Sequence, residues 1–265
     1  AEVGTNCYNS FEIAMEEINA EGGIMGKPVE LVYQDSQNDA TQAVEVAKKF
    51  IEDKTILATL TGDSSTCNIA CANYYEDAKM CLLAGTASNA ALTPMGDYIF
   101  SVAGRNTDEI PFCIKNVLAT QLQVKNLAII YANDDWGVGL NDSATALCGD
   151  AGIEIVGSEQ FSVGETDFSS VLSKLRKSEP DALLVIAQYA EGGLILNQVK
   201  KMGWDVTVTV TGAVVNDDFL KLCGEDAEGL CGYVGMAFVE AYPASMAFYN
   251  KYIEKYNGRT PTVHS

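Results

Sequence analysis

Two hydroxyl-rich segments contain the residue types in this sequence that are best suited to chemistry, and that chemistry is the binding of an anion. The residues are Ser64, Ser65 and Thr66 in the first segment and Thr86, Ala87 and Ser88 in the second. Each segment follows an apolar run, and loops after neighbouring strands line the crevice where open α/β sheets bind ligands. Hydroxyl groups and free backbone N–H groups at a helix start suit a carboxylate. The plainer alternative is that these residues only cap helices.

The elements that position the two segments are predicted from hydrophobic spacing. Residues 55–60 and 80–84 are apolar runs typical of buried strands, and residues 67–79 between them have helical spacing. The first segment therefore links a strand to a helix, and the second follows the next strand.

A similar alternation along the rest of the chain predicts parallel sheets built from βαβ units. Helices are predicted at residues 6–20, 40–53, 108–121, 140–149, 168–177, 190–202, 217–223 and 243–256, and further strands at 28–34, 98–103, 126–131, 153–158, 181–187, 206–210 and 230–238. Residues 133–139 are predicted to be a loop with Trp136 at its centre, and Tyr189 is placed at the end of a buried strand. The number of units indicates two Rossmann-like α/β lobes joined by a hinge. The first lobe is expected at residues 1–104, with 239–265 returning to it, and the second at 105–238.

Composition and charge exclude several classes of partner. The 265 residues carry a net charge of −19, which argues against nucleic acid and anionic membrane surfaces. No apolar run approaches the roughly 20 residues that span a bilayer, so we expect no membrane insertion of this chain. The sequence contains no signal peptide, which a mature secreted protein would have lost.

Motifs for catalysis or cofactor binding are absent from the sequence. His264 is the only histidine, and no CxxC occurs among the eight cysteines, which argues against zinc sites and histidine-based triads. No GxGxxG or GxxxxGK[ST] motif is present. We therefore expect a binding protein with no catalytic residues, cofactor or metal. Cys223 and Cys231 flank an acidic turn and could pair, while burial as small apolar side chains is the alternative for most of the cysteines.

Longer stretches of the sequence carry a family resemblance over nearly the whole chain. They are EEINAEGGIMGKPVELVYQD, GDSST, YEDA, SNAALT, KNLAIIYANDDWGVGL, ETDFSSVLSKLRKSEPDALLV and DAEGLCGY. These stretches resemble type I periplasmic solute-binding proteins, and in particular those that bind branched-chain and hydrophobic amino acids for ABC transporters. The family also has a strand before the segment matching Ala1 and further elements after the segment matching Ser265. Without them, the first lobe is expected to lack its central strand and to have unpaired strand edges.

The resemblance implies a ligand held between the lobes. Its α-carboxylate would meet the two hydroxyl-rich segments, and Trp136 and Tyr189 match aromatic residues of the second lobe that close over the ligand. Of the two acids that meet the α-ammonium, Asp108 matches one. The other falls near Ala213, which is not acidic. Candidates to replace it are Glu191, Asp217 and Asp218, unless the ligand lacks the amine.

The sequence thus predicts the solute-binding component of an ABC importer, with a small amino-acid-like or carboxylated solute and a membrane permease as its partners. A periplasmic or extracellular location is expected, with a lipid anchor on the full-length protein as one form of it. A ligand-sensing domain of a receptor or regulator is the alternative on the same fold. An enzyme on a Rossmann-like fold is the third hypothesis, and the missing phosphate-binding loops argue against it.

Overall fold

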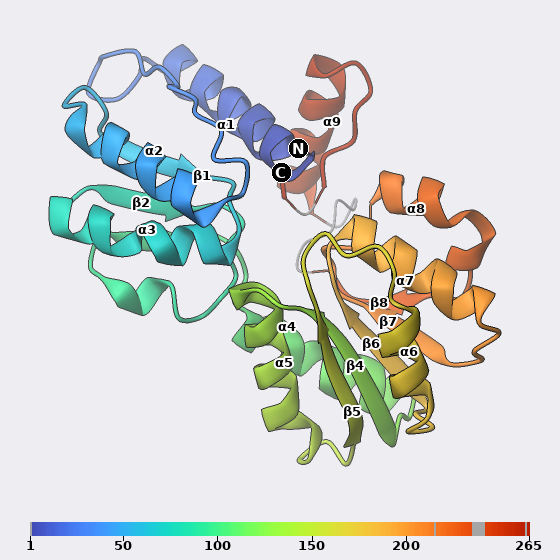
Figure 1. Ribbon diagram of the computed structural model, residues 1–265. Coiled ribbons are helices and arrows are strands. Elements are labelled where there is room, and N and C mark those ends of the chain that lie inside the picture. Colours follow the sequence, from blue (N-terminus) through green and yellow to red (C-terminus); the bar gives the residue numbers. More distant parts are fainter. Residues whose placement is uncertain (1, 215, 235–241, 263) are drawn as a thin grey trace. The chain divides into compact units, whose positions relative to one another are not determined.

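The computed structural model of the chain describes residues 2–214, 216–234, 242–262 and 264–265. Helices and strands alternate along the chain (Figure 1), which divides into two compact units. Unit 1 is Ala1–Ala103 with Met236–Ser265, and unit 2 is Gly104–Gly235. The strands of each sheet pair in parallel. The predicted α/β class with parallel sheets is therefore confirmed.

Unit 1 has a sheet with the strand order β1-β2-β3, and α2 and α3 cover one of its faces. Leu82 and Ala84 on the central strand are fully buried against Ala72 of α3, so the core lies between these two layers. The elements of the unit are α1 (Glu2–Ala20), α2 (Ala40–Glu52), β1 (Ala58–Thr61), α3 (Ser65–Ala78), β2 (Cys81–Ala84), the 3-10 helix η1 (Thr93–Met95), β3 (Ile99–Ser101) and α9 (Pro243–Lys255).

The prediction of a strand at residues 28–34 is wrong, although the apolar alternation is present. The Val29 N–H and C=O bind the side chain of Asn19, and Ser36 Oγ donates to Asp63 Oδ1 at 2.6 Å. No strand of the described residues pairs with the segment between Val29 and Ser36. A strand needs a neighbour for its backbone groups, and β2 is the one described strand that pairs with β1. The expected unpaired edge is thus present at β1.

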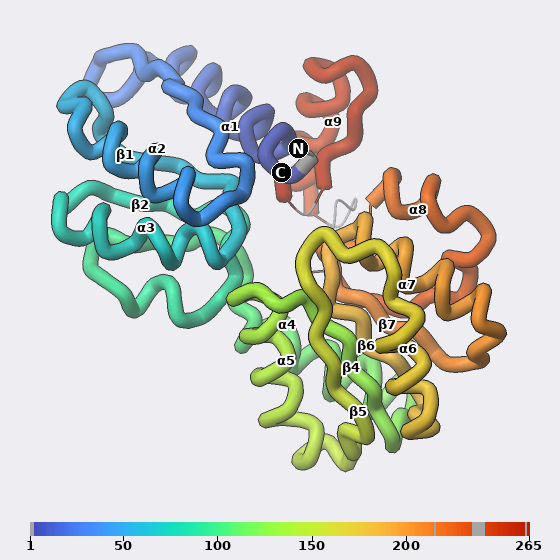
Figure 2. Tube along the Cα trace, viewed as in Figure 1, coloured from blue at the N-terminus to red at the C-terminus, as the bar shows by residue number. Residues whose placement is uncertain are grey.

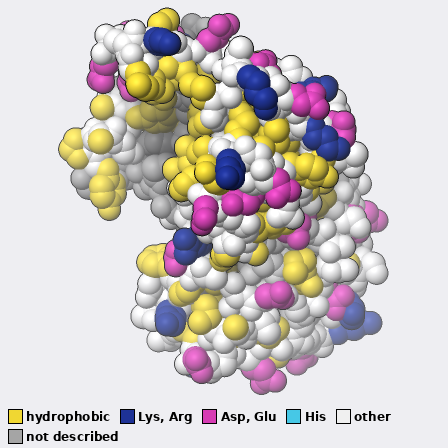
Figure 3. Space-filling model, turned by 90° about the vertical axis from the view of Figure 1, so that its left-hand side faces the viewer, with side chains coloured by type: hydrophobic (Ala, Val, Ile, Leu, Met, Phe, Trp, Pro, Cys, Tyr) yellow, Lys and Arg dark blue, Asp and Glu magenta, His cyan; other side chains and the backbone are white. Residues whose placement is uncertain are grey.

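The second face of this sheet carries apolar side chains that reach the surface. Leu60, Leu83 and Phe100 stand in register across the three strands, and Leu60 and Phe100 remain 39% and 49% exposed. Hydrophobic side chains also reach the surface on the side of the molecule that Figure 3 shows, with acidic side chains among them. Parallel sheets normally bury both faces. In the part of the chain that the structure describes, the fully buried residues of this sheet lie on one face.

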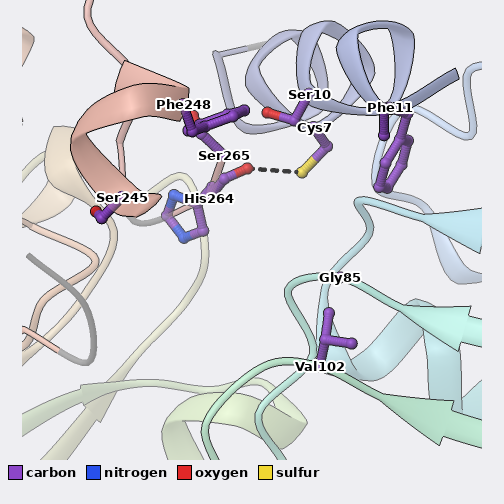
Figure 4. A pocket seen from close by; sticks show the side chains of 10 residues that line it. Cys7, Ser10, Phe11, Gly85, Val102, Ser245, Phe248, His264 and Ser265 are labelled. Carbon is purple, nitrogen blue, oxygen red and sulfur yellow. Dashed lines mark hydrogen bonds between the residues drawn. The ribbon is translucent and has the colours of Figure 1, made fainter. Parts of the chain in front are cut away.

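The last helix of the chain returns to unit 1 and lies beside α1 (Figure 2). Tyr252 of α9 is fully buried, and its hydroxyl donates to Asn6 Oδ1 and accepts from Asn9 Nδ2, both at 2.9 Å. Side chains of both helices also line a cavity of about 390 Å³: Phe11 of α1 and Phe248 of α9 contribute to it, together with His264 and other residues (Figure 4). Burial lowers the pKa of His264 to about 4, so this histidine is neutral at physiological pH.

Unit 2 has a sheet with the strand order β5-β4-β6-β7-β8. All five residues of the central strand are buried, which agrees with the apolar run DALLVIA. One face packs against α6, α7 and α8, and the other against α4, η2 and α5. The elements are α4 (Asn106–Phe112), the π-helix η2 (Cys113–Gln121), β4 (Asn126–Ala132), α5 (Asp135–Cys148), β5 (Glu154–Phe161), α6 (Ser169–Arg176), β6 (Ala182–Ile186), α7 (Tyr189–Lys201), β7 (Thr207–Val210), α8 (Asp217–Cys223), the 3-10 helix η3 (Gly224–Ala227) and β8 (Cys231–Gly232).

Three predicted boundaries in unit 2 are wrong. Residues 133–139 are mostly not a loop, because α5 begins at Asp135 and Trp136 lies in its first turn. Tyr189 does not end a strand but is the first residue of α7. The strand predicted at 230–238 is limited to β8, and its positions 235–238 lie outside the described residues. In the first two cases one residue separates the end of the strand from the helix N-cap, which leaves little loop between them.

Candidate functional site

The two hydroxyl-rich segments come together at the carboxyl ends of β1 and β2, which are paired strands of unit 1. The Asn89 N–H donates to Ser65 Oγ at 3.3 Å, and Thr86 Oγ1 donates to the Asp63 carbonyl oxygen at 2.8 Å. Ser64 is the N-cap of α3, and its Oγ accepts from the Cys67 N–H. The structure therefore unites all six residues predicted from the sequence: Ser64, Ser65, Thr66, Thr86, Ala87 and Ser88.

Asn68 holds the first segment in place and was not identified from the sequence. Its Nδ2 donates to the carbonyl oxygens of Asp63 and Ser64 at 3.0 and 2.9 Å, and its Oδ1 accepts from Thr61 Oγ1 at 2.6 Å. Asn68 is 2% exposed, so these bonds are shielded from water. The N-terminus of α3 thus presents a rigid set of backbone N–H groups and hydroxyls, which is suited to a carboxylate.

Asp63 is a second residue of this site that the sequence reasoning did not single out. Its carboxylate accepts from Ser36 Oγ at 2.6 Å. Burial raises the pKa of Asp63, the Ser36 hydrogen bond opposes that rise, and the nearby charge of Asp35 adds to it. The carboxylate points toward Ser36, whereas the main-chain carbonyl of Asp63 accepts one bond from Thr86 of the second segment and one from Asn68 of α3.

The candidate residues of unit 2 lie at the carboxyl ends of β4 and β6, which are also paired strands. Trp136 and Tyr189 are both half-buried in the first turns of α5 and α7. Glu191, also in the first turn of α7, accepts from the Gly164 N–H at 3.2 Å. The structure thus places Trp136, Tyr189 and Glu191 at one edge of the sheet.

Asp134 adds a second carboxylate at this edge. Its Oδ1 accepts from the Gly137 N–H at 2.7 Å and so caps α5. Burial raises the pKa of Asp134, and the negative charges of Asp135 and Glu191 add to the rise. A nearby cation stabilises a carboxylate that lies close to other negative charges, so this edge favours a positively charged group.

Asp108 is exposed on α4, whereas its neighbour Glu109 is half-buried. Burial, and to a smaller extent the charge of Asp108, raise the pKa of Glu109 to about 7. Asp217 and Asp218 lie in the first turn of α8, which begins after β7. The structure therefore places Asp108, Asp217 and Asp218 on different elements from Trp136 and Glu191.

Some polar groups of unit 2 are buried without a hydrogen-bond partner among the described residues. Gln188 Oε1 and Thr211 Oγ1 are two of them, and these residues follow the paired strands β6 and β7. Ala213, where the resemblance leads one to expect an acid, lies two residues beyond Thr211. Unpaired buried groups are costly, so this edge gains stability from any ligand or water that bonds them.

Within the described part of the chain, no group of three or more histidine, cysteine or acidic side chains is arranged to hold a metal ion. The same residues include no helix that is both long and apolar enough to cross a membrane.

Gly137 is required for the close packing of α5 on β4. A Cβ atom at this position would lie 2.2 Å from the carbonyl oxygen of Ala132. We therefore expect Gly137→Ala to lower the free energy of unfolding by about 2 kcal/mol, the usual cost of overpacking. Gly149→Ala is the control, because a Cβ there meets no atom within 4 Å. Urea unfolding of both variants tests this prediction, and equal midpoints would contradict it.

Comparison with known proteins identifies the family to which the chain belongs. The family model described as "Periplasmic binding protein" matches residues 1–265. The Leu/Ile/Val-binding protein of Citrobacter freundii is 28% identical over 233 residues, which are 87% of this chain and 62% of that protein. The leucine-, isoleucine-, valine-, threonine- and alanine-binding protein of Pseudomonas aeruginosa is 28% identical over 229 residues, which are 85% and 60% of the two chains. The chain thus spans about three fifths of the length of these relatives.

Solved structures agree with this result. The crystal structure of a branched-chain amino acid transporter substrate-binding protein from Streptococcus pneumoniae, in complex with isoleucine, superimposes with a TM-score of 0.88 at 27% identity. The match covers 99% of this chain and 75% of that one. Both the fold class and the family resemblance predicted from the sequence are confirmed by these matches.

Proposed function

Because the chain belongs to the periplasmic binding protein family, we propose that it acts as the solute-binding component of an ABC importer. Its solute is a small α-amino acid or a related carboxylate. The family implies an extracytoplasmic location, and we place the protein in the periplasm or outside the cell, with a lipid anchor on the full-length protein as one form of it. The membrane permease of the importer is its protein partner.

One observation carries this proposal: the paired hydroxyl-rich segments at the N-terminus of α3. Ser65 and Ser88 are 2% and 8% exposed, and hydrogen bonds from Asn89 and Thr86 join the two segments. Such preorganised donors bind an anion without the cost of ordering the loops first. The carboxylate of the solute is assigned to this site.

The other end of the solute is assigned to unit 2. Trp136 and Tyr189 are half-buried aromatic residues at the edge where Asp134 and Glu191 supply negative charge. Aromatic faces and carboxylates together suit an ammonium group. The family has an acidic residue near the position of Ala213. In this chain Asp134 and Glu191 take its place. Closure of the two units around the solute would then follow from contacts that it makes with both.

A thermal-shift panel on the full-length protein tests this function. The panel contains leucine, isoleucine and valine, their 2-keto acids and the corresponding amines without a carboxylate. A solute at about 100 times its Kd stabilises the folded state by about 2.7 kcal/mol, which raises Tm by several degrees. We expect the amino acids to stabilise most, the keto acids less and the amines least. Stabilisation by the amines alone, or by none of the panel, would contradict the proposal.

A further inference from the structure

Three cysteines of unit 2 lie close to one face of its sheet. Cys113 begins η2 and Cys148 ends α5, and both are fully buried in the apolar cluster of that face. Cys231 is the first residue of β8 and is half-buried. All eight cysteines are free thiols in the structure.

The strand register shows which face Cys231 occupies. Residues in register on neighbouring strands point to the same face of a sheet. Leu184 is in register with Thr209, and Thr209 with Cys231. Leu184 belongs to the same cluster as Cys113, and so does Tyr233, which lies two residues after Cys231. Because β8 also packs against η2, Cys231 lies on the same face of the sheet as Cys113.

The electrostatic surroundings of the thiols agree with this placement. Burial raises the pKa of Cys113 to about 12, and among its charged neighbours Cys231 contributes more than Cys148. Cys223, the partner that the sequence suggests for Cys231, belongs to the opposite face, where its Sγ donates to the Gly193 carbonyl oxygen. Cys113 is therefore the better partner for Cys231.

We propose that Cys113 and Cys231 form a disulfide in an oxidising compartment and thereby join the two ends of unit 2. Cys113 lies shortly after the start of this unit at Gly104, and Cys231 shortly before its end at Gly235. The bond would also anchor β8, which pairs with β7 alone among the described strands. The proposal depends on the extracytoplasmic location of the family, where disulfides persist, but not on solute binding.

Oxidised glutathione is the oxidant in the test of this proposal. The more accessible Cys231, as a thiolate, attacks one glutathione sulfur, and the first glutathione leaves as a thiolate. Cys113, as a thiolate, then attacks the Cys231 sulfur of the mixed disulfide and expels the second glutathione. The two protein thiols lose two protons and two electrons, and one glutathione disulfide becomes two glutathione thiols. The second step is expected to be slow, because the raised pKa of Cys113 keeps its thiolate scarce.

The experiment treats the reduced protein with oxidised glutathione and maps the disulfides by peptide mass spectrometry. We expect one bond, between Cys113 and Cys231, the loss of two free thiols and a Tm several degrees above that of the reduced protein. Cys231→Ser should abolish both the bond and the rise in Tm. Cys223→Ala is the control and should keep both.

Other products would overturn the proposal. A bond from Cys113 to Cys148, a bond from Cys231 to Cys223, or a stable glutathione adduct on Cys231 with no internal bond would each do so. Cys113→Ala serves as the second variant, because a serine hydroxyl at this buried position could prevent folding; it should leave Cys231 able to form only the adduct. The thiol map is read without any solute, so a failure of solute binding and a failure of this proposal are distinguished.

Discussion

Replacing Trp136 by alanine is expected to weaken solute binding by about 10- to 100-fold while the protein stays folded. Trp136 is half-buried in the first turn of α5, at the carboxyl end of β4. The indole therefore has a free part that an aliphatic or ammonium group can cover. Isothermal titration with the best solute of the panel measures the change in Kd.

Trp204 is the matched control for this experiment, because the chain has only two tryptophans. Trp204 is 8% exposed and belongs to the apolar core of unit 2. A solute-dependent change in fluorescence should thus persist in Trp204→Phe and disappear in Trp136→Phe. Circular dichroism of Trp136→Ala checks that its fold is intact. A Kd within twofold of the unsubstituted protein would remove Trp136 from the site.

The parts of the fold that could be predicted are those in which local pattern and final environment agree. The strand predicted at 181–187 is apolar from Ala182 onward, and β6 is buried on both faces. The segment at 28–34 has the alternation of a strand, but pairing depends on a neighbour that the pattern cannot supply. Sequence periodicity describes the faces of an element, whereas hydrogen bonding between strands is a property of the whole sheet.

In the candidate site, too, some residues could be predicted from local pattern and others could not. The hydroxyl-rich segments were recognisable because residue type, helix start and position after a strand all point to one chemistry. Trp136 was misplaced in a loop because Gly137 and Gly139 suggest a break, although Asp134 is a typical N-cap residue. Asn68 carried no signal, since an asparagine inside a helical stretch shows its role only when its three hydrogen bonds are seen.

The second large effect is expected for Ser65→Ala, which should weaken the binding of α-carboxylate solutes by about 10- to 150-fold. A hydrogen bond to a charged group contributes about 1.5–3 kcal/mol, and the Ser65 hydroxyl is assigned to the solute carboxylate. Ser65 is 2% exposed, so water does not replace the lost donor easily. The same hydroxyl accepts from the Asn89 N–H, which means that the substitution also loosens the second segment.

Two comparisons separate loss of the donor from loosening of the loops. Ser101→Ala removes a hydroxyl that donates to the Ala87 carbonyl oxygen at 3.1 Å and supports the second segment without a role in solute contact. We expect it to lower Tm but to change Kd by less than about threefold. Leucinol, which lacks the carboxylate of leucine, should bind Ser65→Ala and the unsubstituted protein equally weakly. Because the lost donor acts only on a carboxylate, an equal loss of affinity for leucine and leucinol would mean that Ser65 shapes the loops and does not bind the solute.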